Sequence, residues 1–418
     1  MTALNQGDTA FVLICAALVF IMTPGLGFFY GGLGRRKNCV NNLMACYFIL
    51  GLCMLMWVLF GYSLSFTGNN FGIIGGFDNA LLLGIGINEP SPYSGSINSY
   101  AFVAFQMMFA LITPAIITGA VAGRMKFSAL FIFIAAWSII VYYPLAHMVW
   151  GKGGLLGADG LKAVDFAGGN VVHISSGVSG LVLCLALGKR FGYATTSYRL
   201  HNLPFVALGA ALLWFGWYGF NAGSALGANG LAAHAFLTTS FATACGLLSW
   251  LFMDVIRGRK PSLVSGCTGI VAGLVAITPA AGFVPIWASV IIGLTAGPIC
   301  YLGIIFVKQK LKIDDALDAF GCHGIGGMWG GIMTGVFATP AVNPDACTDG
   351  LIYGSFQQFG SQIASILVTI VVAAVGTLIC VGIVRIFTQL RVGKREELIG
   401  LDVSQHGENA YPSFNGLD

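Results

Sequence analysis

Residues 170 to 188 read NVVHISSGVSGLVLCLALG, and this stretch decides the fold because it is long, apolar and interrupted by a single basic side chain, His173. A second apolar stretch, residues 316 to 338, reads ALDAFGCHGIGGMWGGIMTGVFA and contains His323. An ionisable side chain inside a membrane span is costly, and such groups usually face a bundle interior or a cavity and pair with another polar group. We therefore expect the two histidines to be partners in a functional site.

The composition indicates a membrane protein. Of the 418 residues, 57% are hydrophobic and only 9% are charged, and the mean hydropathy is +0.84. A soluble protein of this composition would struggle to avoid aggregation. Stretches of about 20 apolar residues, enough to cross a bilayer, recur along the chain. We count eleven such spans, over residues 9–31, 40–66, 98–122, 127–147, 170–188, 203–223, 230–256, 261–280, 286–307, 316–338 and 354–386.

Basic residues set the orientation, because loops rich in Lys and Arg stay in the cytoplasm. With the N-terminus outside, only Lys152 and Lys162 of the 20 basic residues fall on the outer side. One span more or fewer in the middle would put half of the basic clusters on the wrong face. The net charge of +4 therefore reflects this bias and not a nucleic-acid-binding surface. The basic residues of the inner side are Arg35, Arg36, Lys37, Arg124, Lys126, Lys189, Arg190, Arg199, Arg257, Arg259, Lys260, Lys308, Lys310, Lys312, Arg385, Arg391, Lys394 and Arg395.

An odd number of spans leaves the N-terminus outside and the C-terminus inside. We expect an all-α membrane protein of two five-helix halves with inverted topology, about 9–188 and 203–338, followed by a final long helix, about 354–386. Inverted repeats place a shared site near the middle of the bilayer. His173 and His323 fall in the last helix of each half, although no long segment of one half visibly aligns with the other.

Residues 1–390 form the expected membrane domain, and 391–418 form a polar cytoplasmic tail. The 11 cysteines are scattered without a CxxC pair, so we expect no disulfide framework. Cys322 lies beside His323, but no further ligands follow at suitable spacing, so we expect neither a metal nor another cofactor. No pattern of nucleophile and base indicates an enzyme. The 59 glycines contain no phosphate-binding loop and mostly indicate close helix packing.

Four ordered segments carry a resemblance to a known family. They read DFAGGNVVH over residues 165–173, GWYGFNAGS over 216–224, AFGCHG over 319–324 and GLDVSQHGENAY over 400–411. The chain resembles, nearly end to end, the ammonium transporter branch of the ammonium transporter, methylammonium permease and Rhesus family. The resemblance implies a homotrimer in the cell membrane, surrounded by lipid, with one pore for ammonium or methylammonium through each subunit.

By the resemblance, Phe109, Trp150 and Ser224 form an outer site that recruits ammonium. Aromatic faces attract a desolvated cation by roughly 0.5 to 2 kcal/mol, and the serine hydroxyl offers an oxygen acceptor. Phe109 and Phe220 resemble the stacked pair that closes the pore mouth and excludes water and bare ions. The alternative for Trp150 is an interfacial anchor, and without the resemblance the two phenylalanines would be assigned to core packing.

His173 and His323 resemble the polar centre of the pore, where two neutral imidazoles can share a proton and relay it. For either residue alone, a histidine bonded to a helix carbonyl is the alternative. Asp165 lies about two helical turns before His173, at the start of the fifth span. The helix N-terminus stabilises an acid there, so we expect a structural and electrostatic role first and proton acceptance second. The family places Trp217 beside the histidines as a pore wall.

Several other positions match the family more weakly. Thr278 resembles a residue that lines the pore further on, and Phe29, Gln106 and Tyr142 match positions near the entrance. Asn170 stands where many members have threonine, a departure that leaves the central residues unchanged. The tail is similar to that of the family, which implies packing on the inner face of the trimer and binding of a PII-type regulatory protein.

Three functions fit these motifs. The transporter that the resemblance implies is electrogenic: ammonium loses its proton near the gate, ammonia passes the histidines and the proton crosses separately. An ammonium sensor of the same fold would bind the cation without net flux and signal through its tail, although no signalling domain is visible in the 418 residues. A Rhesus-type ammonia gas channel is the third, and the outer site of Phe109, Trp150 and Ser224 argues against it.

Overall fold

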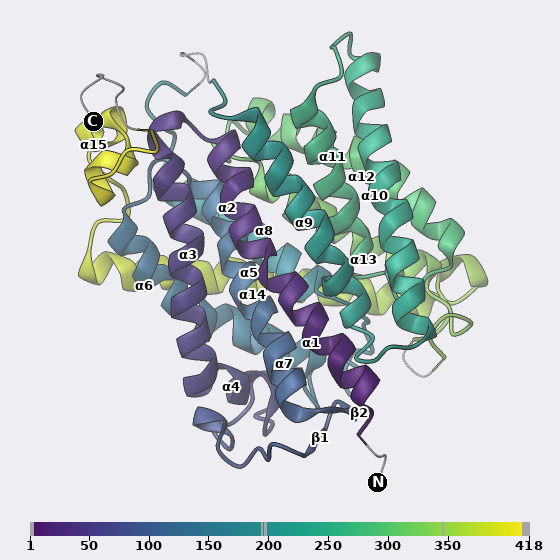
Figure 1. The fold of residues 1–418 in the computed structure, drawn as a ribbon. Coiled ribbons are helices and arrows are strands. Elements are labelled where there is room, and N and C mark those ends of the chain that lie inside the picture. Colours follow the sequence, from purple (N-terminus) through teal and green to yellow (C-terminus); the bar gives the residue numbers. More distant parts are fainter. Residues whose placement is uncertain (1–3, 194, 196–198, 345–346, 412–418) are drawn as a thin grey trace.

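The computed structural model describes residues 4–193, 195, 199–344 and 347–411, which form a bundle of long helices (Figure 1). Within these residues, nine helical runs are long and apolar enough to cross a membrane, so the chain is a mostly helical, multi-pass membrane protein. The runs are Gln6–Leu33, Arg36–Phe66, Ser99–Val121, Phe127–Trp150, Gly169–Leu187, Leu203–Gly223, Gly230–Ile256, Ile286–Lys310 and Phe356–Phe387.

Short π-helical segments divide several runs into separate elements, and the loop before α5 holds a small antiparallel hairpin. The α-helices are α1 (Gln6–Phe20), α2 (Met22–Leu33), α3 (Cys39–Met56), α4 (Tyr62–Phe66), α5 (Ser99–Val121), α6 (Phe127–Trp137), α7 (Tyr143–Trp150), α8 (Ser175–Leu187), α9 (Leu203–Gly223), α10 (Gly230–Ile256), α11 (Leu263–Ile277), α12 (Ile286–Ile305), α13 (Ile325–Phe337), α14 (Phe356–Phe387) and α15 (Lys394–Ile399). The shorter elements are η1 (Arg36–Asn38), η2 (Trp57–Gly61), η3 (Ala80–Leu82), β1 (Pro90–Ser91), β2 (Ser94–Asn98), η4 (Ser138–Tyr142), η5 (Gly169–Ile174), η6 (Phe306–Lys310), η7 (Phe320–Gly324), η8 (Leu351–Tyr353) and η9 (Asp402–His406).

Two of the eleven expected spans hold shorter helices. In the expected span 261–280, α11 ends at Ile277 and the chain turns through Thr278 and Pro279. Proline has no N–H to continue the helix ladder, which favours a helix end at this point. The expected span 316–338 holds the π-helical turn η7 followed by α13. The described residues therefore contain nine long runs, and the count of eleven membrane spans remains a prediction.

The segments that carry the two histidines pack directly against each other. A Cβ added to Gly177 of α8 would lie 2.3 Å from the backbone nitrogen of Gly324 in η7, and one added to Gly327 of α13 would lie 3.0 Å from the Cβ of His173 in η5. Small residues allow helix backbones in membranes to approach this closely. The two contacts are reciprocal, and they bring His173 and His323 together between the two elements.

The tail folds back on one end of the bundle, opposite the end where α1 begins (Figure 1). The main-chain N–H of Lys126 donates to the carbonyl of Leu390 at 3.1 Å, and Arg391 pairs with Glu397 at 2.7 Å. The ammonium group of Lys37 donates to the carbonyl of Glu397 at 2.9 Å. Basic loop residues thus gather where the tail packs, as the orientation argument requires. That this end faces the cytoplasm remains a prediction.

Candidate functional site

Side chains of α5, α7 and the end of α9 line a cavity of about 140 Å³, which we call the outer cavity because the expected orientation places it on the outer side. The rings of Phe109 and Trp150 meet edge to face, with centroids 5.8 Å apart. The hydroxyl of Ser224 donates to the carbonyl of Phe220 at 2.9 Å, which leaves its oxygen lone pairs for another partner. The three residues expected to recruit the cation therefore line one cavity. Its other lining residues are Phe66, Tyr93, Phe102, Gln106, Phe166 and Leu226.

Two stacked phenylalanines close this cavity on one side. The ring centroids of Phe109 and Phe220 lie 4.2 Å apart with an interplanar angle of 30°, and both side chains are buried. Beyond the stack is a narrow cavity of about 10 Å³, lined by Phe220, Trp217, His173 and His323 together with aliphatic side chains. That volume is about enough for one water molecule. The stack thus separates the outer cavity from the narrow one.

The Nδ1 atoms of His173 and His323 lie 3.2 Å apart, and the two side chains are 1% and 4% exposed. A hydrogen bond between two ring nitrogens needs one donor and one acceptor, so two neutral rings share one proton at Nδ1 and differ in tautomer. Among the described residues, Nε2 of His173 has no hydrogen-bond partner. The pair therefore offers polar atoms within a cavity whose other walls are apolar.

Trp217 forms one wall beside the pair. Its ring stacks on His173, with centroids 5.4 Å apart and planes 24° apart. The indole N–H donates to the hydroxyl of Thr278 at 2.8 Å, and that hydroxyl donates to the carbonyl of Leu274 at 2.7 Å. Thr278, which we expected along the pore, is thus placed behind Trp217, where it orients the indole.

Asp165 caps the element that carries the first histidine. Its Oδ1 accepts the main-chain N–H groups of Gly168 at 2.8 Å and Gly169 at 2.6 Å. Its Oδ2 accepts those of Asn170 at 2.7 Å and Val171 at 3.4 Å. The first N–H groups of a helix lack partners within the helix, and an acid there also interacts favourably with the helix dipole. This geometry matches the structural role expected for Asp165.

Asp315 makes the same arrangement in the other half and was missed from the sequence. Its Oδ1 accepts the N–H of Ala319 at 3.1 Å, and its Oδ2 accepts that of Phe320 at 2.9 Å. The two histidines are separated by 150 residues, and so are Asp165 and Asp315. An aspartate therefore precedes each histidine at the same spacing. Together with the two histidines, this repeated spacing is a sequence signal that relates the two expected halves, and it identifies the second acid.

Two residues expected near the entrance lie elsewhere. Phe29 lines the narrow cavity and also an inner cavity that contains Arg35 and Lys308, so it belongs to the tail end of the path. Tyr142 is 1% exposed and packs within a cluster of aromatic rings instead of lining the outer cavity. Of the three residues, Gln106 alone lines the outer cavity.

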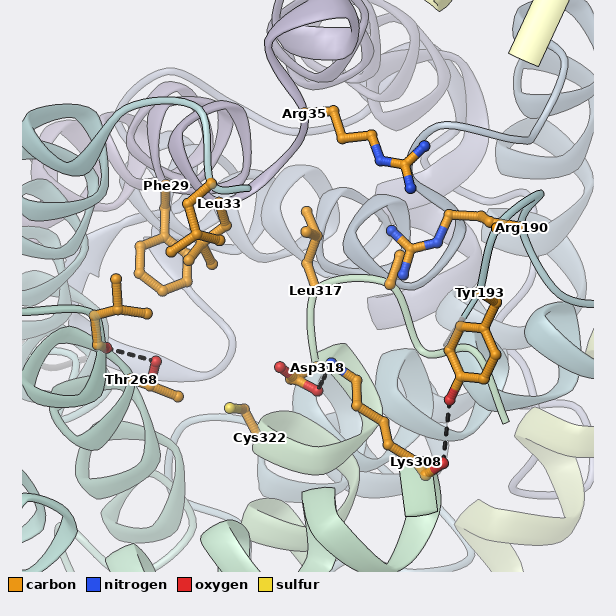
Figure 2. A pocket seen from close by; sticks show the side chains of 14 residues that line it. Phe29, Leu33, Arg35, Arg190, Tyr193, Thr268, Lys308, Leu317, Asp318 and Cys322 are labelled. Carbon is orange, nitrogen blue, oxygen red and sulfur yellow. Dashed lines mark hydrogen bonds and ion pairs between the residues drawn. The ribbon is translucent and has the colours of Figure 1, made fainter. Parts of the chain in front are cut away.

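Figure 2 shows the inner cavity, which has a volume of about 360 Å³. Cys322, the neighbour of the second histidine, lines it, and Lys308 and Asp318 form an ion pair at 2.5 Å on its wall. Arg190 pairs with Asp314 at 2.6 Å. Burial alone would raise the pKa of Asp314, but hydrogen bonds and the charge of Arg190 outweigh it and hold that pKa below its ordinary value. The inner mouth is therefore charged, unlike the narrow cavity.

The three cavities follow one another: Phe109 lines the outer cavity and Phe220, stacked on it, lines the narrow one, while Phe29 lines both the narrow and the inner cavity. Within the part of the chain that the structure describes, no three His, Cys, Asp or Glu side chains are grouped to hold a metal ion. An apolar constriction with a polar centre between two wider mouths defines a membrane protein with a selective path for a small solute. The profile of the Ammonium Transporter Family matches residues 10–411, and the chain belongs to this family of membrane transporters.

Similar proteins cover the chain almost completely. An ammonium transporter of Bacillus subtilis is 49% identical over 408 residues, which are 98% of this chain and 99% of that protein. The crystal structure of Saccharomyces cerevisiae Mep2 matches with a TM-score of 0.90 and 37% identity, over 99% of this chain and 93% of that one. A structure described as a Sensor Amt Protein matches with a TM-score of 0.86 and 29% identity, over 96% and 98%. The family resemblance seen in the motifs is confirmed.

Proposed function

We propose that this chain is an electrogenic ammonium transporter that takes up NH₄⁺ at the outer cavity, removes its proton and passes NH₃ and H⁺ separately through the narrow cavity. One observation carries the proposal. Two histidine nitrogens lie 3.2 Å apart in a cavity that is otherwise apolar and directly follows an aromatic stack. A neutral solute and a proton can each use such a passage, whereas a hydrated cation does not fit.

The outer cavity has the groups that replace water around a small cation. The faces of Phe109 and Trp150 would attract it by roughly 0.5 to 2 kcal/mol each. Ser224 offers hydroxyl lone pairs, and the side-chain oxygen of Gln106 has no hydrogen-bond partner among the described residues. A cation with N–H groups can donate to both oxygens. Ammonium is therefore held by charge and by hydrogen bonds together.

The stack of Phe109 and Phe220 accounts for deprotonation and for selectivity. Moving an ion out of water into an apolar space of about 10 Å³ costs far more than moving a neutral molecule of the same size. Ammonium avoids this cost by giving up a proton, which an imidazole of the histidine pair accepts, whereas potassium and sodium have no proton to give. The same barrier therefore admits ammonia and rejects the metal cations.

The histidine pair provides the polar route beyond the stack. A proton entering at one imidazole can leave from the other, because each ring can exchange its donor and acceptor nitrogens. Asp165 and Asp315 hold the starts of the two elements that bring the rings together. In this mechanism both acids act by position and charge, and the proton moves through His173 and His323.

The test is the current that ammonium evokes. Purified protein in proteoliposomes on a supported membrane should give a saturable inward current after an ammonium pulse and little response to potassium or sodium. Protein-free liposomes are the control for leak. Equal responses to the three cations would reject the selectivity that we propose.

A sensor role is the second candidate, since a structure described as a Sensor Amt Protein shares this fold. A sensor needs a binding cavity but no exit. Here an inner cavity of about 360 Å³ follows the histidines, which favours transport. Saturable ammonium binding without any current would support the sensor instead.

We also propose a homotrimer with one pore in each subunit, because the chain belongs to the family for which we expect that assembly. Exposed apolar side chains on the spans, such as Leu13 and Ile14 on α1 and Phe215 on α9, would be covered by lipid or by a neighbouring subunit. The tail end is where a PII-type regulatory protein would bind. Methylammonium, which also carries N–H groups, would be accepted as a substrate.

A further inference from the structure

Gln362 on α14 forms two hydrogen bonds with the main chain of Val164, the residue just before Asp165. Its side chain is 1% exposed. Oε1 accepts the main-chain N–H of Val164 at 2.7 Å, and Nε2 donates to the carbonyl of the same residue at 2.8 Å. One amide thus satisfies both main-chain groups of a residue on another segment, which fixes the direction of the peptide that leads into Asp165.

Asp165 is in turn the attachment point of Trp150. The indole N–H of Trp150 donates to the main-chain carbonyl of Asp165 at 2.8 Å. On the other side, the N–H of Phe166 donates to the carbonyl of Pro279 at 3.2 Å. Asp165 therefore lies between two anchored neighbours: Val164 is bonded to α14, and Phe166 is bonded to the turn after α11.

A second amide on α14 supports this contact. The side-chain N–H₂ of Gln358 donates to the carbonyl of Lys162 at 3.2 Å and to Oε1 of Gln362 at 3.4 Å. Polar side chains in membrane helices bond across to neighbouring segments because lipid offers no partner. Each of these two buried amides of α14 thus donates to a main-chain carbonyl of the segment that leads to Asp165, while the oxygen of Gln358 accepts from Thr348.

We propose that Gln362 is a positioning residue that sets the affinity of the outer cavity for ammonium, acting on Trp150 through Val164 and Asp165. The proposal rests on the proposed function of that cavity. Among the described residues, the carboxylate of Asp165 bonds to main-chain N–H groups three to six positions further along the chain, so those bonds move with the segment. Trp150 comes from another helix, so a shift of the segment lengthens its bond to Asp165, together with the bond from Phe166 to Pro279.

The experiment replaces Gln362 by leucine. Gln362→Leu leaves the N–H and carbonyl of Val164 buried without partners, which a folded chain avoids by shifting. We expect the ammonium concentration for half-maximal current to rise roughly tenfold, as expected for loss of the Trp150 contact, with maximal current kept within about twofold. In a Trp150→Leu background, Gln362→Leu should not raise the half-saturating concentration further, because both changes remove the same contact between Trp150 and the cation.

Two variants serve as controls. Thr369→Val removes a buried hydroxyl from the same helix, and that hydroxyl bonds to the carbonyl of Ser365 in α14 itself at 2.8 Å. It should leave half-saturation unchanged. Gln362→Glu should stay within about twofold of the wild type, because a buried carboxyl stays neutral and a neutral carboxyl both donates and accepts. If Gln362→Leu does not assemble, Gln362→Asn takes its place, since it keeps the amide but is one methylene too short.

An unchanged half-saturation in Gln362→Leu, an equal shift in Thr369→Val, or full additivity with Trp150→Leu would overturn the proposal. The same variants are compared by ammonium-induced thermal stabilisation, which needs binding but no flux. A wild-type protein that is stabilised by ammonium but carries no current would reject transport, and the affinity of Gln362→Leu would still decide the role of Gln362.

Discussion

Three residues leave different surfaces open to the outer cavity. Phe109 offers a ring face, Ser224 offers lone pairs because its proton is used on Phe220, and Trp150 offers a face while its N–H is bound to Asp165. Each is therefore fixed by a bond or a packing contact before the cation arrives. Such preorganisation lowers the ordering cost of binding.

Trp150→Leu tests this outer site at the scale of one side chain. A desolvated contact between a cation and an aromatic face is worth about 1 to 2 kcal/mol, and each 1.4 kcal/mol is about tenfold in binding. We expect half-saturation to rise roughly tenfold, with saturated current retained or increased because the ion leaves the site more easily. Currents recorded across a range of ammonium concentrations check this. No change in half-saturation would make Trp150 an interfacial anchor.

Some residue placements follow from the sequence and others do not. The cap at Asp165 follows from its distance to His173 and its place at a span start. The position of Phe29 should have followed as well: with the N-terminus outside and Arg35 inside, a residue six positions before Arg35 lies near the inner end, at 1.5 Å of rise per residue. The family motif predicts a position near the entrance instead, and the structure places Phe29 between the narrow and the inner cavity. The bond from Gln362 to Val164 joins distant segments, and no local pattern predicts it.

At the scale of elements, one helical segment (η5 and α8) packs against another (η7 and α13). This contact fixes the positions of the two histidines. Glycine at position 177 allows it, because a Cβ there would lie 2.3 Å from the backbone nitrogen of Gly324. Backbone atoms on both sides leave no flexible side chain to give way. The histidine distance therefore depends on a contact between main chains.

Gly177→Ala should separate these elements. Overpacking of this kind costs typically about 1 to 3 kcal/mol, so the thermal midpoint of the purified protein should fall by several degrees and the ammonium current should fall with it. Gly382→Ala on α14 is the matched control, since none of the described residues lies within 4 Å of the added Cβ. Equal midpoints for the two variants would mean that the contact adjusts without strain.

At the scale of the whole molecule, the proposed path consists of the outer cavity, an apolar barrier, a polar pair and a charged inner mouth, in that order between the two ends of the bundle. Hydropathy and basic loops alone predict the helical membrane fold, because both depend only on the bilayer. Hydropathy and basic loops do not predict the order of the cavities, because each cavity is lined by residues from spans that are far apart in the chain. The repeated spacing of Asp165 to His173 and Asp315 to His323 is a relation between the two expected halves that can be read from the sequence.

The measurement that tests the central claim most directly is the ammonium current of His173→Leu, recorded beside the wild type on a supported membrane. Its control is His234→Leu, a histidine of α10 whose Nε2 lies 2.9 Å from the carbonyl of Val284 and which lines none of the three cavities. Because the proton route needs both rings, we predict that His173→Leu loses the current while it assembles normally, and that His234→Leu keeps it. A His173→Leu protein with wild-type current and wild-type discrimination against potassium would contradict the account and reduce the histidine pair to packing.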